Sequence, residues 1–399
     1  MSSSWYDEID TDLNACSLET LYTPLKKNET TFPVVVGCYQ LNEGTDSKNE
    51  DEEEGKPTRS GELLLHQIGS DFQFSKGDDL KRIRTDSGVL DGKWLQSGPF
   101  KANNGEGICE ESYIYATANA SGSLNIYRMN DEGEDVDLVH ICATDGDADV
   151  DGLALSLAWD ECNFATTENG TCSPRTVSSY SKGSLAIHEI TQNGEWTNMK
   201  VEETQRWDAH TLFGCPSEVW TCCFASNKHY NTYQDTIISG GDDCKMKLWD
   251  LRMCSTPTSV KKGFDAGVTA VSYHPSLEHV FAVGSYDEYV RVWDMRKISD
   301  EPLNNIHVGG GVWRVKWHPH DNSRILVGAM HGGCRLVNIE GIESSIIDEE
   351  YETNAHITKK FTEHKSMAYG ADWIVSKDSF EAAASCSFYD KKCFTWTSQ

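Results

Sequence analysis

The sequence predicts an all-β fold, a seven-bladed β-propeller in which four-stranded sheets close into a ring. Seven segments share one strand pattern that ends on an aromatic or apolar residue: Leu63-Leu-Leu-His66, Leu124-Asn-Ile-Tyr127, Leu185-Ala-Ile-His188, Met246-Lys-Leu-Trp249, Val290-Arg-Val-Trp293, Cys334-Arg-Leu-Val337 and Cys393-Phe-Thr-Trp396. The last residues of these segments are 61, 61, 61, 44, 44 and 59 positions apart. A period near 44 residues is typical of one four-stranded blade, and the longer spacings leave room for loop insertions of about 15 to 20 residues.

Two of the segments continue as Trp249-Asp-Leu-Arg252 and Trp293-Asp-Met-Arg296, the Trp-Asp signature of WD40 repeats. A β-rich run with a tight turn precedes each segment, as in Thr236-Ile-Ile-Ser-Gly-Gly-Asp-Asp243. We therefore interpret residues 1–399 as a single WD40 β-propeller domain. Residues 42–60 are polar and contain an acidic run, so they are expected to form a disordered loop insertion.

The N-terminus is expected to close the ring. The seventh segment ends at Trp396, three residues before the end of the chain, which leaves the seventh blade without an outer strand. The segment Trp5-Tyr-Asp-Glu-Ile-Asp10 precedes the first blade and is expected to supply the missing strand. Such a closure removes an exposed sheet edge.

Three aspartates stand six positions before the tryptophan that ends their segment: Asp243, Asp287 and Asp390. In WD repeats this aspartate orients a buried histidine near the start of the blade. We expect His210 to pair with Asp243 and His364 to pair with Asp390, in structural roles.

Blade six departs from this pattern because His331 takes the place of the structural aspartate, in Ala329-Met-His-Gly-Gly333. One interpretation is a degenerate repeat. The other is a titratable group at the rim of the central channel, because an imidazole has a pKa suited to proton transfer near neutral pH.

Further residues lie near strand starts or in turns that face one end of the channel: Trp220, Asp242, Tyr286, Trp313, Arg314, Tyr369, Asp372, Ser387 and Tyr389. Aromatic rings and aspartates around a cavity suit a quaternary ammonium ligand. Ordinary packing between blades is the alternative for each ring.

Charge limits the partners that are expected. The formal net charge is −28 and the pI is near 4.8. Such a field repels nucleic acid and anionic membranes, and it favours a cationic partner, although solubility alone also explains it. No stretch reaches the roughly 18 apolar residues of a membrane helix, and the N-terminus lacks the layout of a signal peptide. We expect a cytoplasmic monomer.

Cysteine usage and motifs predict no metal and no cofactor. The 14 cysteines show no Cys-x-x-Cys spacing. The nucleophile elbow, the zinc-protease motif, the Walker loop and the Rossmann glycine pattern are all missing from the sequence. From motifs alone the chain is a non-catalytic WD40 scaffold, for example a ubiquitin-ligase substrate adaptor, for which Arg252 and Arg296 would suit docking.

An ordered set of strings is more particular than a generic repeat: Ser239-Gly-Gly-Asp-Asp243, Gly284-Ser-Tyr-Asp-Glu288, Gly310-Gly-Val-Trp-Arg314, Lys316-Trp-His-Pro319, Met330-His-Gly332, Tyr369-Gly-Ala-Asp-Trp373 and Cys386-Ser-Phe-Tyr-Asp390. In this order they resemble the diphthine methyl ester hydrolase family, the WD-repeat proteins of diphthamide biosynthesis. Near the N-terminus, Asp10-Thr-Asp-Leu13 and Gly37-Cys-Tyr-Gln40 resemble it as well.

The resemblance implies a methylesterase whose protein substrate is elongation factor 2. A modified histidine of that factor carries a trimethylammonium group and a methylated carboxylate. Hydrolysis of the methyl ester gives diphthine and methanol, and an ATP-dependent amidation by another enzyme follows.

Position and chemistry then suggest roles for this chain's residues, independently of the family. His331 is the predicted base, and Arg314 or the backbone N–H groups of residues 309–311 and 332–333 are the predicted oxyanion donors. Tyr286, Trp313 and Tyr369 are expected to stack on the ammonium, with Asp242 or Asp372 as its counter-charge. A covalent route through Ser387 or Cys386 is the alternative to an activated water.

Overall fold

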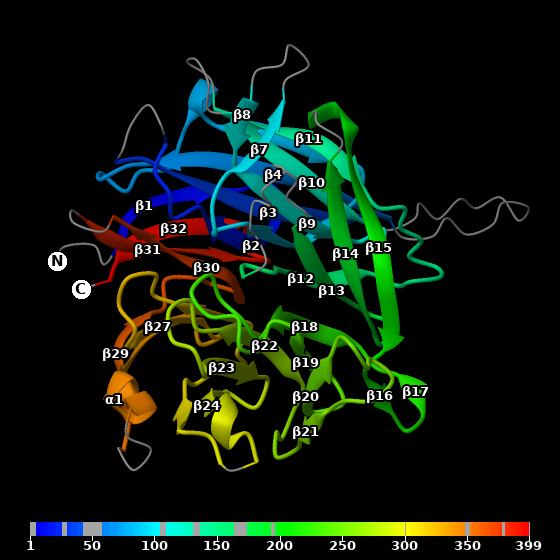
Figure 1. The fold of residues 1–399 in the computed structure, drawn as a ribbon. Coiled ribbons are helices and arrows are strands. Elements are labelled where there is room, and N and C mark those ends of the chain that lie inside the picture. Colours follow the sequence, from blue (N-terminus) through cyan, green and yellow to red (C-terminus); the bar gives the residue numbers. More distant parts are fainter. Residues whose placement is uncertain are drawn as a thin grey trace, which may run out of the picture.

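The computed structural model describes residues 5–25, 30–42, 58–103, 109–130, 136–162, 174–192, 196–299, 301–347, 352–376 and 380–398. Its strands form seven four-stranded antiparallel sheets, arranged as a ring (Figure 1). The predicted seven-bladed propeller is confirmed. Most of the expected acidic insertion lies outside the described residues, so its predicted disorder stays a prediction.

The blades follow one another along the chain, each from an inner to an outer strand. Blade 1 contains β2 (Asn14–Thr20), β3 (Phe32–Asn42), β4 (Thr58–Ile68) and β5 (Lys81–Thr85). Blade 2 contains β6 (Val89–Trp94), β9 (Ile114–Asn119), β10 (Leu124–Asn130) and β11 (Asp137–Ala143). Blade 3 contains β12 (Ala154–Trp159), β13 (Arg175–Tyr180), β14 (Ser184–Gln192) and β15 (Met199–Asp208). Blade 4 contains β18 (Val219–Phe224), β19 (Thr236–Gly241), β20 (Lys245–Asp250) and β21 (Ser259–Lys261). Blade 5 contains β22 (Val268–Tyr273), β23 (Val280–Ser285), β24 (Tyr289–Asp294) and β25 (Asn304–His307). Blade 6 contains β26 (Arg314–Trp317), β27 (Arg324–Gly328), β28 (Cys334–Glu340) and β29 (Asn354–Phe361).

Blade 7 joins the two ends of the chain. It contains β30 (Ala368–Val375), β31 (Glu381–Ser387) and β32 (Lys392–Thr397), and β1 (Trp5–Asp10) is its outer strand. Strand β1 runs antiparallel to β32, with Trp5 opposite Trp396 and Ile9 opposite Cys393. The expected closure by the N-terminal segment is therefore confirmed, and Figure 1 shows the two ends of the chain side by side.

Apolar strands packed between neighbouring blades form the core. Between blades 5 and 6 the cluster includes Val290, Val292, Ile325 and Val327, all fully buried. Blades approach closely where a strand carries glycine: a Cβ on Gly240 would lie 2.4 Å from a methyl group of Val268 in the next blade. This explains why small residues alternate with β-branched ones in the second strand of each blade.

Blade 4 holds the expected structural network. His210 Nδ1 lies 2.7 Å from Asp243 Oδ1, and His210 Nε2 lies 2.8 Å from Ser239 Oγ. Trp249 Nε1 donates to the same serine at 2.9 Å. The predicted pairing of His210 with Asp243 is thus confirmed. Through Ser239, His210 also links the segment before blade 4 to Trp249 in β20.

Blade 7 differs from the expectation. His364 Nε2 lies 2.8 Å from Ser385 Oγ, which also accepts from Trp396. However, Asp390 accepts from the backbone N–H of Lys365 at 2.8 Å, and His364 Nδ1 has no hydrogen-bond partner among the described residues. The predicted bond between His364 and Asp390 is wrong, because the aspartate caps the loop that carries the histidine and does not bond the ring.

Short hairpins and short helices accompany the seven blades. Two hairpins, β7 (Phe100–Asn103) with β8 (Cys109–Ser112) and β16 (Thr211–Leu212) with β17 (Cys215–Pro216), stand outside the blades. The helices are short: α1 (Ile342–Ile347), η1 (Gly77–Asp79), η2 (Trp196–Asn198) and η3 (Met295–Lys297). In the described part of the chain, none of the helices has the length and apolar character required to cross a membrane.

Candidate functional site

The inner strands enclose a central cavity of about 580 Å³. Its lining begins at Trp220 and Trp313, where the inner strands start, and reaches His229 and His320 beyond the strand ends. We call the end at Trp220 and Trp313 the mouth. The lining residues at the opposite end include the exposed Lys228, His229 and His320. The cavity therefore extends along the length of the channel.

Four of the predicted aromatic residues meet at the mouth, from blades 4 to 7. Trp313 stacks on Tyr369 with ring centroids 4.8 Å apart, and it lies 5.6 Å from Trp220 and 5.9 Å from Tyr286. All four side chains are half-buried, so each keeps an exposed part of its ring. We call this group the aromatic mouth.

Asp242 adds a carboxylate to the aromatic mouth. Its Oδ1 accepts a hydrogen bond from Trp220 Nε1 at 3.1 Å. Because a cation over the face of an aromatic ring gains electrostatic attraction, and a nearby carboxylate adds to it, this group has the chemistry of a receptor for an alkylammonium.

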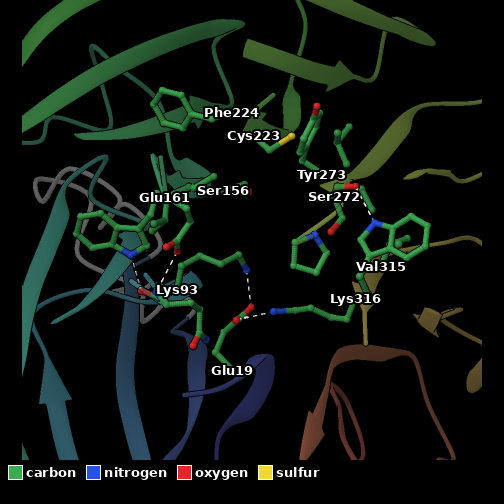
Figure 2. A pocket seen from close by; sticks show the side chains of 18 of the residues that line it. Glu19, Lys93, Ser156, Glu161, Cys223, Phe224, Ser272, Tyr273, Val315 and Lys316 are labelled. Carbon is green, nitrogen blue, oxygen red and sulfur yellow. Dashed lines mark hydrogen bonds and ion pairs between the residues drawn. The ribbon is translucent and has the colours of Figure 1, made fainter. Parts of the chain in front are cut away.

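Below the aromatic mouth, charged side chains from four inner strands form what we call the channel network. Its members are Glu19, Asp91, Lys93, Arg314, Lys316 and Asp372. Lys93 Nζ lies 2.6 Å from one oxygen of Glu19, and Lys316 Nζ lies 2.5 Å from the other. Figure 2 shows the two lysines reaching Glu19 from different strands.

The upper part of the channel network centres on Asp91. Its Oδ1 lies 3.0 Å from Lys93 Nζ and 3.1 Å from Arg314 Nη1, and its Oδ2 accepts from Ser156 Oγ at 3.0 Å. Burial opposes ionisation of Asp91, but the charges of Arg314 and Lys93 outweigh it and hold the pKa of this carboxyl well below its usual range. Asp91 is therefore a fixed anion that orients cations, and it is a weak base.

Asp372 lies deeper than the sequence suggested. It accepts from the backbone N–H of Thr20 at 2.9 Å, from the Tyr22 hydroxyl, and from Lys316 at 3.3 Å. Burial raises the pKa of Asp372, and Lys316 offsets part of that rise. The side chain is fully buried and engaged within the channel network, so Asp242 is the carboxylate that remains beside the aromatic mouth.

Arg314 connects the aromatic mouth to the channel network. It follows Trp313, lines the cavity and is held by Asp91. Its Nε is buried and has no hydrogen-bond partner among the described residues. A buried donor without a partner is costly, so an acceptor that reached this N–H would gain a hydrogen bond.

Glu161 lies at the opposite end of the cavity. One of its oxygens accepts from the backbone N–H of Gln96 at 2.9 Å, and burial raises the pKa of Glu161 to about 7. Arg314 opens β26, whereas Glu161 follows the end of β12. The two side chains therefore start from opposite ends of the inner strands.

His331 is exposed on the turn between β27 and β28 and is not part of the cavity lining. The residue that corresponds to Asp242 and Tyr286 in this blade is Met330. Gly267 lies between the side chains of Asp242 and Tyr286, and Gly311 lies in the same way between those of Tyr286 and Met330. His331 is thus on the same face as the aromatic mouth, one residue beyond the position that faces it.

The predicted nucleophiles are inaccessible. Ser387 and Cys386 are both fully buried at the end of β31, and neither lines the cavity. Tyr389, in the next turn, is exposed on the surface. Within the described cavity lining, the serine hydroxyl that binds Asp91 belongs to Ser156.

The sequence analysis gave no site role to four members of the channel network: Glu19, Asp91, Lys93 and Lys316. A signal for some of them exists, because Asp91 and Lys93, like Arg314 and Lys316, are two positions apart. Residues i and i+2 of a strand point to the same side. In an inner strand, that side is the channel.

Comparisons with known proteins support the fold and assign the family. Residues 206–250 and 255–294 match the family described as WD domain, G-beta repeat. A relative from Dictyostelium discoideum, named diphthine methyltransferase homolog, is 30% identical over 394 residues, which cover 91% of this chain and 92% of the relative. This chain belongs to the diphthine methyltransferase family.

Other family members agree. The relative named diphthine methyltransferase from Mus musculus is 31% identical and matches 92% of this chain and 68% of its own length. The one from Homo sapiens is 28% identical, with 92% and 73% covered. The family resemblance seen in the sequence is therefore confirmed, although these family members are named for methyl transfer and not for ester hydrolysis.

A solved structure supports the fold alone. A chain of the structure described as "Crystal Structure of Mitotic Checkpoint Complex" aligns with a TM-score of 0.60 over 100% of this chain and 95% of that chain. The sequence identity is only 14%, so the similarity concerns the propeller and not its activity.

Proposed function

We propose that this protein hydrolyses the methyl ester of methylated diphthine on elongation factor 2, giving diphthine and methanol in diphthamide biosynthesis. Family membership supports a diphthine-related role. The observation that carries the proposal is the aromatic mouth, whose Trp313 directly precedes Arg314, an arginine with a buried Nε–H that has no partner among the described residues. A cytoplasmic site of action accords with a substrate that works in translation.

The substrate offers two groups that match this arrangement. Its trimethylammonium cation would lie against Trp220, Tyr286, Trp313 and Tyr369, with Asp242 as counter-charge. Each ring contributes about 0.5–2 kcal/mol to such a contact once it is desolvated. The neighbouring ester would then reach Arg314, which directly follows Trp313 in the chain.

Hydrolysis proceeds by attack of water on the ester carbonyl. The carbonyl oxygen becomes an oxyanion that accepts from Arg314 Nε–H, and collapse of the intermediate breaks the bond to the methoxy group. The products are the carboxylate, methanol and one proton. The adjacent cationic nitrogen withdraws electrons from the carbonyl, so a positioned water, a base and one oxyanion donor suffice.

His331 remains the proposed base. Its support is its imidazole chemistry and its place on the face of the aromatic mouth, where it would receive the proton of the attacking water. The burial of Ser387 and Cys386 favours direct attack by water over the covalent route. Ser156 is the alternative nucleophile within reach of the cavity.

The test uses purified protein and elongation factor 2 that carries methylated diphthine, with no methyl donor added. We expect the factor to lose the mass of one methylene unit, methanol to appear, and isotope-labelled water to leave one labelled oxygen in the new carboxylate. If the protein binds the factor and the ester stays intact, the alternative of a non-catalytic scaffold is right. If the factor gains a methyl group only when a methyl donor is present, the proposed direction is wrong.

A further inference from the structure

The β16–β17 hairpin presents an aromatic residue to solvent. Thr211 pairs with Pro216 and Leu212 pairs with Cys215, which leaves Phe213 and Gly214 as a two-residue turn. The Phe213 side chain is 98% exposed, and Leu212 beside it is also exposed. Both turn residues have positive φ, 52° for Phe213 and 84° for Gly214. Positive φ at both positions is the geometry of a type I′ turn, which disfavours a residue with a Cβ such as phenylalanine.

The base of the hairpin is rigid, in contrast to its exposed tip. The backbone N–H groups of Ala209 and His210 both donate to the carbonyl of Gly183, and Ser217 N–H donates to His210 O at 3.1 Å. His210 is fully buried and belongs to the structural network of blade 4. The backbone that carries Phe213 is therefore anchored to blade 4, which reduces the part of the hairpin that a partner would have to order on binding.

The hairpin lies on the same face as the aromatic mouth. It connects the outer strand of blade 3 to the inner strand of blade 4, and that inner strand starts at the mouth. Trp220, a member of the aromatic mouth, follows Pro216 by four residues. In Figure 1 the hairpin projects from the edge of the ring between blades 3 and 4.

A second apolar side chain accompanies Phe213 in an acidic setting. The loop before β12 exposes 69% of Val150 between Asp149 and Asp151, and Asp145 and Asp147 precede it. This loop packs on the β13–β14 turn, where Ser181 Oγ accepts from Leu153 N–H. The β16–β17 hairpin binds Gly183 of the same turn. The two apolar tips thus flank one turn. Arg206 pairs with Asp151 at 3.4 Å and Lys182 lies in the turn itself, so the excess of carboxylates here comes from Asp145, Asp147 and Asp149.

We infer that the β16–β17 hairpin, with Phe213 at its tip, is a docking anchor for the protein that carries the substrate ester; this inference rests on the proposed function. A protein that places a modified side chain in the aromatic mouth must cover the surrounding face. Phe213 would fill an apolar pocket on that protein, and the acidic loop around Val150 would face basic side chains. A second copy of this acidic chain is a poor occupant, because like charges would meet.

The experiment replaces Phe213 while keeping its turn. Phe213→Asn creates an Asn-Gly turn, the preferred sequence for type I′, so the hairpin is retained and only the anchor is lost. The matched control is Met253→Asn, since Met253 is 69% exposed and follows β20, at the opposite face. We measure the dissociation constant for elongation factor 2 bearing methylated diphthine, and kcat and KM for that factor and for a small methyl ester of a trimethylammonium amino acid.

We expect Phe213→Asn to weaken binding and raise KM for the factor at least about tenfold, with kcat unchanged. The small ester should be turned over at the wild-type rate, and Met253→Asn should change neither substrate. Unchanged affinity for the factor in folded Phe213→Asn protein would overturn the inference. Failure of wild-type protein to hydrolyse either ester would instead overturn the proposed function, and the dissociation constants would still decide whether Phe213 is an anchor.

Discussion

The aromatic mouth and the channel network are neighbours in one channel, but they differ in how far their polar groups are paired within the protein. In the channel network every carboxylate meets a cation, and Glu19 alone receives two lysines. At the border with the aromatic mouth, Arg314 keeps a buried N–H without a partner among the described residues, and the rings above it stay half exposed. The carboxylates of the channel network are thus paired within the protein, whereas the Arg314 N–H and the half-exposed rings leave room for contacts with a ligand.

Acidification should have the largest effect on folding stability, because it acts on histidines that are buried in the interior of the molecule. Burial lowers the pKa of His66, His188, His274 and His364 to about 4, against about 6.5 in the unfolded chain. Between these values the unfolded chain binds protons that the folded chain does not, so stability is lost as the pH falls from 6.5 towards 4. Each histidine contributes about 3 kcal/mol to this loss. Thermal unfolding from pH 7.5 to 4.5 measures it, and a constant Tm would contradict it.

Removing the shared carboxylate of the channel network should come next. Glu19→Gln leaves Lys93 and Lys316 buried with less compensation, so the free energy of unfolding should fall by about 3–5 kcal/mol. Denaturant unfolding measures the change. Glu202→Gln on the exposed side of β15 is the control and should stay within about 0.5 kcal/mol. An equal effect of the two variants would mean that the channel network is not structural.

Changing the donor at the border should affect chemistry more than stability. Arg314→Lys keeps a cation near Asp91 but removes the Nε–H, so kcat should fall about 10²–10³-fold, as it does on loss of one oxyanion donor. KM should change little, because the donor acts mainly in the transition state. Steady-state kinetics separates the two parameters. A rise in KM with wild-type kcat would show that Arg314 only binds the substrate.

His331→Ala tests the proposed base. We expect kcat to fall about 10²-fold or more while stability stays within about 1 kcal/mol, because the side chain is exposed. Steady-state kinetics and denaturant unfolding of the variant measure the two effects separately. Wild-type turnover by the folded variant would exclude His331, and Ser156→Ala would then test the alternative.

Loss of one ring from the aromatic mouth should have the smallest effect. Trp313→Leu should lower kcat/KM about 2–30-fold, which corresponds to one cation–π contact. The control is an uncharged substrate in which carbon replaces the ammonium nitrogen. If both substrates lose the same factor, the ring contributes shape and not charge recognition.

The propeller was predictable because its signals are local. Strand pattern, turn and spacing repeat within each blade, and the outer strand from residues 5–10 followed from the missing strand of blade 7. The rings of the aromatic mouth were also predictable, because they stand at strand starts and tight turns. The channel network was not, because Lys316 and Glu19 are 297 residues apart and only ring closure brings them together.

The side-chain directions in two turns could not be predicted either. The sequence gives the same spacing for Asp243, Asp390 and His331, but only Asp243 bonds the histidine of its blade. In blade 6, Met330 has the same spacing as Asp242 and Tyr286 and lies beside Tyr286 at the mouth, whereas His331 is exposed. Such differences depend on backbone geometry within the turn, which spacing does not encode.

A crystal structure with a small methyl ester of a trimethylammonium amino acid bound tests the central claim most directly. The account predicts the ammonium among Trp220, Tyr286, Trp313 and Tyr369, with the ester carbonyl within hydrogen-bond distance of Arg314 Nε. A ligand found instead at the opposite end of the channel, beside Glu161, would contradict it.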